Sequence, residues 1–134
     1  MSPSEADPNA PPVASGAAAA VLDAQALARL AELDPDGSGE LVQRVLRTYV
    51  ASMERLMLDF RNARASAQAT ALRHVAHTLK SSSASVGALQ LAALCAQLEQ
   101  HVREGGQVPD SNTLDTLEAE SARVASAVRA MLGH

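Results

Sequence analysis

Residues 76–83 are the part of the chain best suited to chemistry, because a histidine is followed three positions later by a lysine and then by three serines. On a helix, where each residue turns by about 100°, one stripe of this region collects the apolar and small side chains and is expected to face a core. That stripe consists of Leu72, Val75, Ala76, Leu79, Ser83 and Val86. His77 falls nearly opposite the stripe. Its neighbours one turn away are Arg73, His74, Lys80 and Ser81. The pattern predicts an imidazole that projects into water beside cations.

Phosphoryl transfer is the chemistry that this arrangement favours. A neutral imidazole nitrogen is nucleophilic near pH 7, and a phosphoryl group in transfer spreads negative charge over its equatorial oxygens. Lys80 can stabilise those oxygens, with weaker support from Arg73, and the small residues Ser81, Ala84 and Ala88 would let a donor protein approach the ring. The chain has no Gly-rich phosphate loop, so we expect the phosphoryl group to come from another protein.

Three other sites are weaker interpretations. His74 and His77 have the spacing of metal ligands, but Arg73 and Lys80 flank them and we expect no carboxylate on that face to complete a shell. A Ser81–His77 dyad would lack an oxyanion hole and an orienting acid. Residues 34–40 resemble a calcium loop only in part, because the twelfth position is Val45 instead of a bidentate Glu. A break between two helices is the preferred interpretation of that segment.

The hydropathy pattern predicts an all-α fold. Hydrophobic residues make up 47% of the 134 residues, yet there are only one Tyr, one Phe and no Trp, which favours an aliphatic core between closely packed helices. Apolar spacing predicts a short helix that Asp23 can cap and a long helix over 39–64. It also predicts a helix from the 62–68 turn to Gly87, a natural left-handed end, and helices over 88–104 and 111–132. The expected architecture is an antiparallel four-helix bundle with a short N-terminal capping helix over 21–134, preceded by a disordered Pro/Ala-rich tail over 1–20.

Composition also excludes several classes of partner. A net charge of −4 without basic runs argues against nucleic acid, and no apolar run reaches the roughly 20 residues of a membrane span. The single Cys95 lies in an apolar stretch, where a buried thiol is the simplest interpretation. These features predict a cytoplasmic protein, which we expect to be a monomer.

The motif over residues 76–88 resembles the histidine-containing phosphotransfer (HPt) domain family of multistep two-component phosphorelays. The family pattern is approximately Ala-His-x-Leu-Lys-Gly-Ser-Ser, three variable residues, and Gly-Ala. Here it reads Ala-His-Thr-Leu-Lys-Ser-Ser-Ser-Ala-Ser-Val-Gly-Ala. The next helix of the family is similar to the stretch that holds Leu91, Leu94, Cys95, Leu98 and Glu99. Ser81 stands where the family usually has Gly, so its hydroxyl adds bulk beside the ring and is expected to affect transfer rate and partner preference.

The resemblance implies that His77 is the phosphoacceptor and that Lys80 stabilises the phosphoryl group. The partner would be the receiver domain of a response regulator or of a hybrid histidine kinase, and that receiver would bring the Mg²⁺; the chain itself would need no cofactor and would have no kinase activity. We predict a docking surface around His77 and Lys80 formed by Thr70, Arg73, His74, Ser81, Ala84 and Ala88. Structural roles are expected for Ser82, Ser83 and Gly87, with serine hydroxyls bonded to carbonyls four residues earlier. The alternatives are a helical adaptor that docks a receiver or kinase without carrying phosphate, and a metal-binding bundle that needs both His74 and His77.

Overall fold

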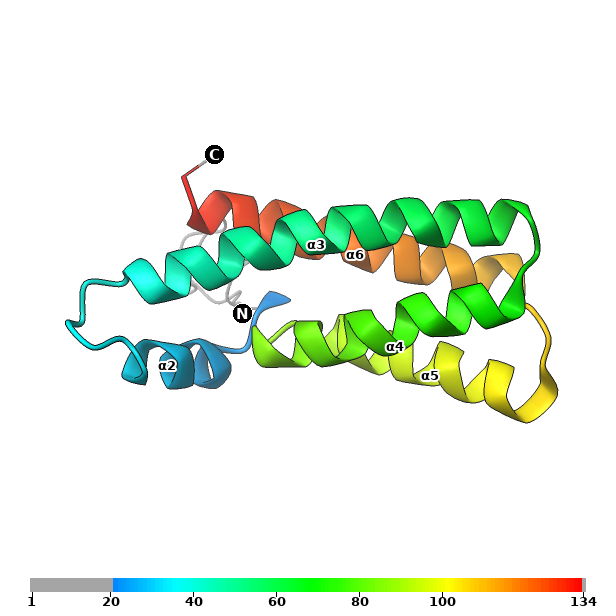
Figure 1. Ribbon diagram of the computed structural model, residues 1–134, viewed down its shortest axis with the longest axis horizontal. Helices are drawn as coiled ribbons and strands as arrows, with labels where there is room; N and C mark the ends of the chain where they lie inside the picture. Colours follow the sequence, from blue (N-terminus) through cyan, green and yellow to red (C-terminus); the bar gives the residue numbers. More distant parts are fainter. Residues whose placement is uncertain (1–20, 134) are drawn as a thin grey trace, which may run out of the picture.

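The four longer helices run alternately in opposite directions, as the sequence predicts (Figure 1). The computed structural model describes residues 21–133, so the predicted tail over 1–20 and His134 lie outside the described residues. The helices are α2 (Ala24–Glu32), α3 (Glu40–Ala65), α4 (Ala69–Ser85), α5 (Leu89–Gly105) and α6 (Ser111–Met131). Short α2 continues roughly in line with the α4–α5 pair and lies beneath the N-terminal half of α3 (Figure 1). The prediction of a four-helix bundle with a short N-terminal helix is confirmed.

Aspartates start two of these helices. The side chain of Asp23 accepts a hydrogen bond from the amide of Ala26 at 3.1 Å, and that of Asp110 accepts one from Thr113 at 2.8 Å. Each carboxylate thereby accepts from an amide of the first helical turn, where the amides have no carbonyl partner within the helix. The predicted cap at Asp23 is confirmed.

The segment between α2 and α3 is a helix break whose acidic groups bind the backbone of the segment itself. Asp34 Oδ2 accepts a hydrogen bond from the Gly39 amide at 2.8 Å, and Asp36 Oδ1 accepts one from the Ser38 amide at 3.1 Å. Gly39 has a φ of 86°, and α3 begins at the next residue. The helix start therefore follows the loop at once, as the sequence predicts.

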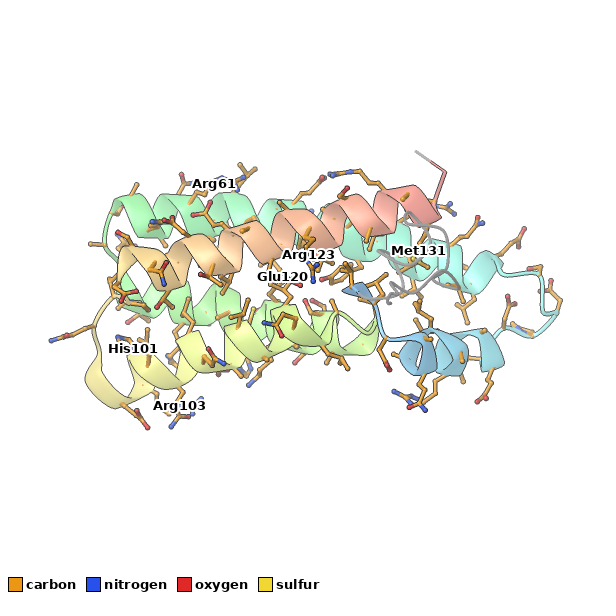
Figure 2. All side chains as sticks on the ribbon, turned by 180° about the vertical axis from the view of Figure 1, so that it is seen from behind. Arg61, His101, Arg103, Glu120, Arg123 and Met131 are labelled. Carbon is orange, nitrogen blue, oxygen red and sulfur yellow. The ribbon has the colours of Figure 1, made fainter. Side chains whose placement is uncertain are left out.

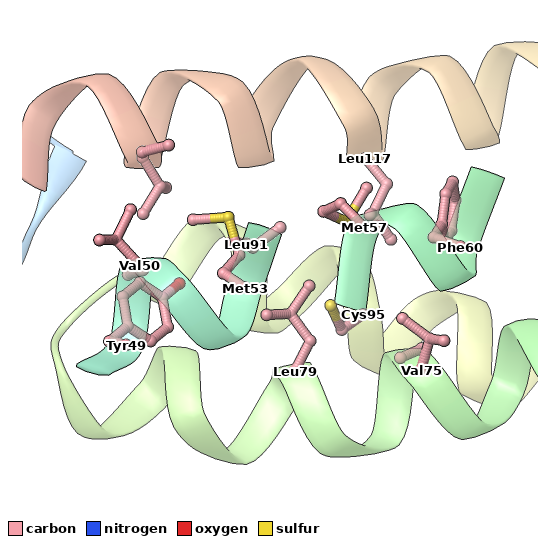
Figure 3. Packing of buried hydrophobic residues seen from close by; sticks show 14 of the residues in the cluster. Tyr49, Val50, Met53, Met57, Phe60, Val75, Leu79, Leu91, Cys95 and Leu117 are labelled. Atoms are coloured by element: carbon pink, nitrogen blue, oxygen red, sulfur yellow. The ribbon is translucent and has the colours of Figure 1, made fainter. Parts of the chain in front are cut away.

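The core between the helices is mostly aliphatic. Met53 and Met57 of α3, Leu79 of α4 and Leu117 of α6 point into one interior (Figure 3). Cys95 of α5 is fully buried among them, and burial raises the pKa of its thiol to about 12. The thiol is therefore protonated at neutral pH, which confirms that Cys95 serves as a small buried side chain.

A left-handed glycine ends α4 and sets the direction of α5. Gly87 has a φ of 86°; its amide donates to the Ala84 carbonyl at 3.2 Å, and the next amide, that of Ala88, donates to the Ser83 carbonyl at 2.8 Å. These two bonds form a Schellman motif. The Gly87 carbonyl also accepts a hydrogen bond from the Asp23 amide at 2.8 Å, which fixes the start of α2 against the α4–α5 turn.

Among residues 21–133, no helix is long and apolar enough to cross a membrane.

Candidate functional site

His77 lies on the solvent-facing side of α4, where its side chain is 64% exposed. The opposite face of the helix supplies the predicted buried stripe. The six members, Leu72, Val75, Ala76, Leu79, Ser83 and Val86, are all at most 7% exposed. Because the stripe packs into the core, the helix has no freedom to rotate His77 inward. The predicted projection of the imidazole into water is confirmed.

A buried carboxylate on the neighbouring helix binds one of the two ring nitrogens. Glu99 of α5 is only 3% exposed, and its Oε2 lies 2.7 Å from Nδ1 of His77. An ionised carboxylate can only accept, so Nδ1 carries the proton and donates a hydrogen bond to Glu99. In the neutral ring, the lone pair then resides on Nε2. The contact therefore fixes both the tautomer and the orientation of an otherwise exposed imidazole.

The same carboxylate also binds two cations. Lys80 Nζ donates to Glu99 Oε1 at 2.7 Å, and Arg103, near the end of α5 (Figure 2), lies 3.2 Å from Glu99 Oε2. The hydrogen bond from Lys80, followed by that from His77, lowers the pKa of Glu99 from its usual 4.5 to about 2, although burial opposes the shift. Glu99 is therefore ionised at neutral pH.

These contacts leave a nucleophile and positive charge on one surface. Nε2 of His77 has its lone pair free, and the Glu99 carboxylate lies against Nδ1, on the other side of the ring. The Lys80 side chain is half-buried and that of Arg103 is exposed, so the ammonium and the guanidinium are both accessible to an incoming anion. The arrangement suits attack on an electrophile that carries negative charge, such as a phosphoryl group.

Most of the predicted docking residues surround His77. Thr70, His74, Ser81 and Ala84 are exposed on α4, and Arg73 is half-buried there. The prediction for Ala88 is wrong, because Ala88 is 0% exposed and cannot contact a partner. The helical pattern ends with α4 at Ser85, and beyond it the Schellman turn carries the chain inward.

The three residues with predicted structural roles have them, though one by another contact. Ser82 Oγ donates to the carbonyls of Thr78 and Leu79 at 3.4 and 3.3 Å, which confirms the backbone bond expected of a helical serine. Ser83 instead pairs with the hydroxyl of Tyr49 on α3 at 2.8 Å inside the core. Its predicted bond to the carbonyl four residues earlier is wrong, because a buried tyrosine hydroxyl needs a partner there.

Comparison with known proteins agrees with this geometry. The Hpt domain family matches residues 44–127. The chain belongs to the Hpt domain family. It is also similar to the crystal structure of histidine-containing phosphotransfer protein B (HptB) from Pseudomonas aeruginosa PAO1, with a TM-score of 0.74 and 31% identity over 84% of this chain and 95% of that one. No curated protein sequence matches the chain significantly. Histidine phosphotransfer in a two-component phosphorelay is the function of this family and of this chain.

Sequence reasoning gave no role to Glu99, which proves to be the centre of the site in this Hpt domain. Two expectations are wrong for that reason: an orienting acid does bind His77, and a carboxylate does lie beside it. Within the described residues, no three His, Cys, Asp or Glu side chains are grouped as a metal site. One signal pointed to Glu99, since it lies among Cys95, Leu98 and Val102 on the inward face of α5, where an acid needs a partner.

Proposed function

We propose that His77 is the phosphoacceptor of this Hpt domain and that it reacts through Nε2. One observation supports this most directly: Nδ1 is held by Glu99 at 2.7 Å, while the ring as a whole remains 64% exposed. The nitrogen with the free lone pair is thus the one that a partner can reach. The other exposed histidine of α4, His74, has no such partner among the described residues.

In the forward step, the Nε2 lone pair attacks the phosphorus of a receiver's aspartyl phosphate. A P–N bond forms, the P–O bond to the aspartate breaks, and the aspartate carboxylate leaves with the electron pair. The Nδ1 proton stays in place, so the phosphorylated ring is cationic and Glu99 balances its charge. Transfer onward to a second receiver reverses these bond changes.

Lys80 is assigned to the phosphoryl oxygens. Its ammonium lies one turn from His77 and, among residues 21–133, is bound only to Glu99, and its side chain is 35% exposed. When the group arrives, the ammonium can be shared between Glu99 and a phosphoryl oxygen. Thr70, Arg73, His74, Ser81 and Ala84 are proposed as the surrounding contact surface for the receiver.

The chain is proposed to work without kinase activity or a cofactor of its own. The sequence has no nucleotide-binding loop, and both oxygens of the carboxylate nearest His77 already accept from protein donors. We therefore assign the Mg²⁺ of the reaction to the receiver domain. We further propose that the chain acts as a monomer.

The test is phosphoryl transfer from a panel of receiver domains charged with acetyl phosphate. The wild type, His77→Gln and His101→Gln would be compared, with acid-labile phosphate mapped on the chain. His101 is a matched control, since it is an exposed histidine on α5. We expect label on the wild type and on His101→Gln, and none on His77→Gln. Label that persists in His77→Gln would contradict the assignment.

The alternative is a helical adaptor that docks a receiver or a kinase without carrying phosphate. It predicts that receivers bind the wild type and His77→Gln equally and label neither. Binding measured by calorimetry on the same panel distinguishes the two functions, because an adaptor does not need a reactive nitrogen at residue 77.

A further inference from the structure

Four serines lie in the C-terminal half of α4, and their hydroxyls differ in one respect. Ser82 bonds backbone carbonyls, Ser83 bonds the Tyr49 hydroxyl, and Ser85 Oγ donates to the Ser81 carbonyl at 3.1 Å. The Ser81 hydroxyl alone makes no hydrogen bond within residues 21–133, although a helical serine can bond the carbonyl four residues before it. That hydroxyl is exposed and available to a ligand.

Ser81 is also one of the two residues, with Lys80, that lie one turn beyond the reactive ring on its C-terminal side. Residues four apart on a helix have Cβ atoms about 5–6 Å apart, and each Cα–Cβ bond tilts toward the helix N-terminus. The Ser81 hydroxyl therefore lies over the turn that carries His77. Since Nδ1 of His77 faces Glu99 on α5, a group on Nε2 extends away from Glu99, on the solvent-exposed side of the ring.

Two other donors near the ring, Lys80 and Arg103, differ from Ser81 because they are already engaged. Lys80 and Arg103 both bind Glu99, so either must leave or share that carboxylate to reach a phosphoryl oxygen. The Ser81 hydroxyl, in contrast, has to give up only a hydrogen bond to water before it can bind a phosphoryl oxygen. A hydrogen bond to a charged acceptor is stronger than one between neutral groups, so this exchange favours the phosphorylated state.

We propose that the Ser81 hydroxyl donates a hydrogen bond to an oxygen of the phosphoryl group on His77 and so shifts the transfer equilibrium toward the phosphorylated chain. This inference rests on the proposed function of His77. It makes Ser81 a phosphoryl-binding residue, distinct from its place on the docking surface.

The equilibrium constant of reversible transfer separates these two roles. That constant compares the free phosphorylated and unphosphorylated proteins, so a change in docking alters the rates in both directions and leaves the constant unchanged. A hydrogen bond that exists only in the phosphorylated chain alters the constant itself. With a net value of about 1 kcal/mol for such a bond, its loss shifts the constant about fivefold.

The experiment measures this constant, approached from both sides, with the receiver domain that labels the wild type best. Ser81→Ala is expected to shift the equilibrium about fivefold toward the phosphorylated receiver, and Ser81→Thr, which keeps the hydroxyl, is expected to retain the wild-type value. Ser85→Ala is the matched control, because its hydroxyl is already bonded to the backbone, and it should also retain that value. Thermal unfolding of each variant would verify that α4 is intact.

Two results would overturn the inference, and they differ in what else they overturn. An unchanged constant in Ser81→Ala, with label still on His77, would remove the role of Ser81 and leave the proposed function standing. An absence of label on His77 in the wild type and in every variant would overturn both.

Discussion

Lys80 Nζ and Glu99 Oε1 lie 2.7 Å apart, although 19 residues separate them in the sequence. The lysine assigned to the phosphoryl group is thus paired with a buried carboxylate in the unphosphorylated protein. The pair holds Lys80 beside His77, because the same carboxylate binds Nδ1 of the ring at 2.7 Å. Glu99 therefore positions the nucleophile and the cation with one side chain.

Replacing Lys80 by alanine is expected to slow phosphoryl transfer to His77 by about tenfold or more, because an ammonium is lost from the developing charge. Lys80→Arg should retain part of the rate. Transfer rates from one charged receiver at saturating concentration would measure the effect, and receiver affinity would be measured separately. Arg103→Ala serves as a comparison, since Arg103 also binds Glu99. An equal loss of rate in both variants would mean that Lys80 acts only through Glu99.

Changing Glu99 to glutamine preserves the shape of the side chain and removes its charge. Nδ1 then loses a charged acceptor, and the cationic phosphorylated ring loses its counter-charge. We expect the transfer equilibrium to move about tenfold away from phosphorylated His77. Nitrogen NMR of the ring should show the Nδ1–H tautomer in the wild type and a mixture in the variant. Glu104→Gln, an exposed change on the same helix, should match the wild type in both measurements.

The lowered pKa of Glu99 predicts a specific loss of stability in acid. In the unfolded chain the carboxyl titrates near 4.5, and in the folded protein near 2, chiefly because Lys80 donates to it. Between these values the unfolded state binds more protons, so the stabilisation is complete above about pH 4.5 and is lost as the pH falls toward about 2. The free energy of unfolding, measured with urea at about pH 5.5 and about pH 3, should fall more between these two pH values for the wild type than for Glu99→Gln. Equal losses would contradict the assigned pKa.

Local periodicity was enough to predict the exposed face of α4. The spacing of Leu72, Val75 and Leu79 fixes which side of the helix is buried, and His77 follows from it. A capping aspartate and a left-handed glycine likewise act within a few residues, so Asp23 and Gly87 could be assigned from the sequence.

The contacts that the sequence did not predict join distant parts of the chain. Glu99 lies 22 residues from His77, and Ser83 lies 34 residues from Tyr49. Which residues meet in each case depends on how far one helix is shifted along the other, and no single-helix pattern contains that shift. Ala88 differs in kind, because it lies beyond the end of α4, where the helical pattern no longer decides which side chains are exposed.

The close contact between Gly87 and α2 gives a prediction about stability. A Cβ atom on Gly87 would lie 2.8 Å from the Asp23 amide nitrogen and 2.9 Å from its carbonyl oxygen, and φ is 86°. Gly87→Ala therefore has to strain the turn and displace the start of α2, including the bond from the Asp23 amide to the Gly87 carbonyl. We expect a loss of more than about 2 kcal/mol in the free energy of unfolding.

Gly106→Ala is the matched control for this substitution. Gly106 ends α5 with a φ of 69°, yet a Cβ atom there would have nothing within 4 Å. The backbone strain in Gly106→Ala is similar to that in Gly87→Ala, but the clash is absent. Gly106→Ala should therefore lose only about 1 kcal/mol in the free energy of unfolding. Hydrogen exchange should separate the two variants further, because only Gly87→Ala is expected to expose the amides of Ala26 and Leu27 at the start of α2. Equal losses of stability, with α2 equally protected in both variants, would show that the contact between Asp23 and Gly87 contributes nothing to anchoring α2.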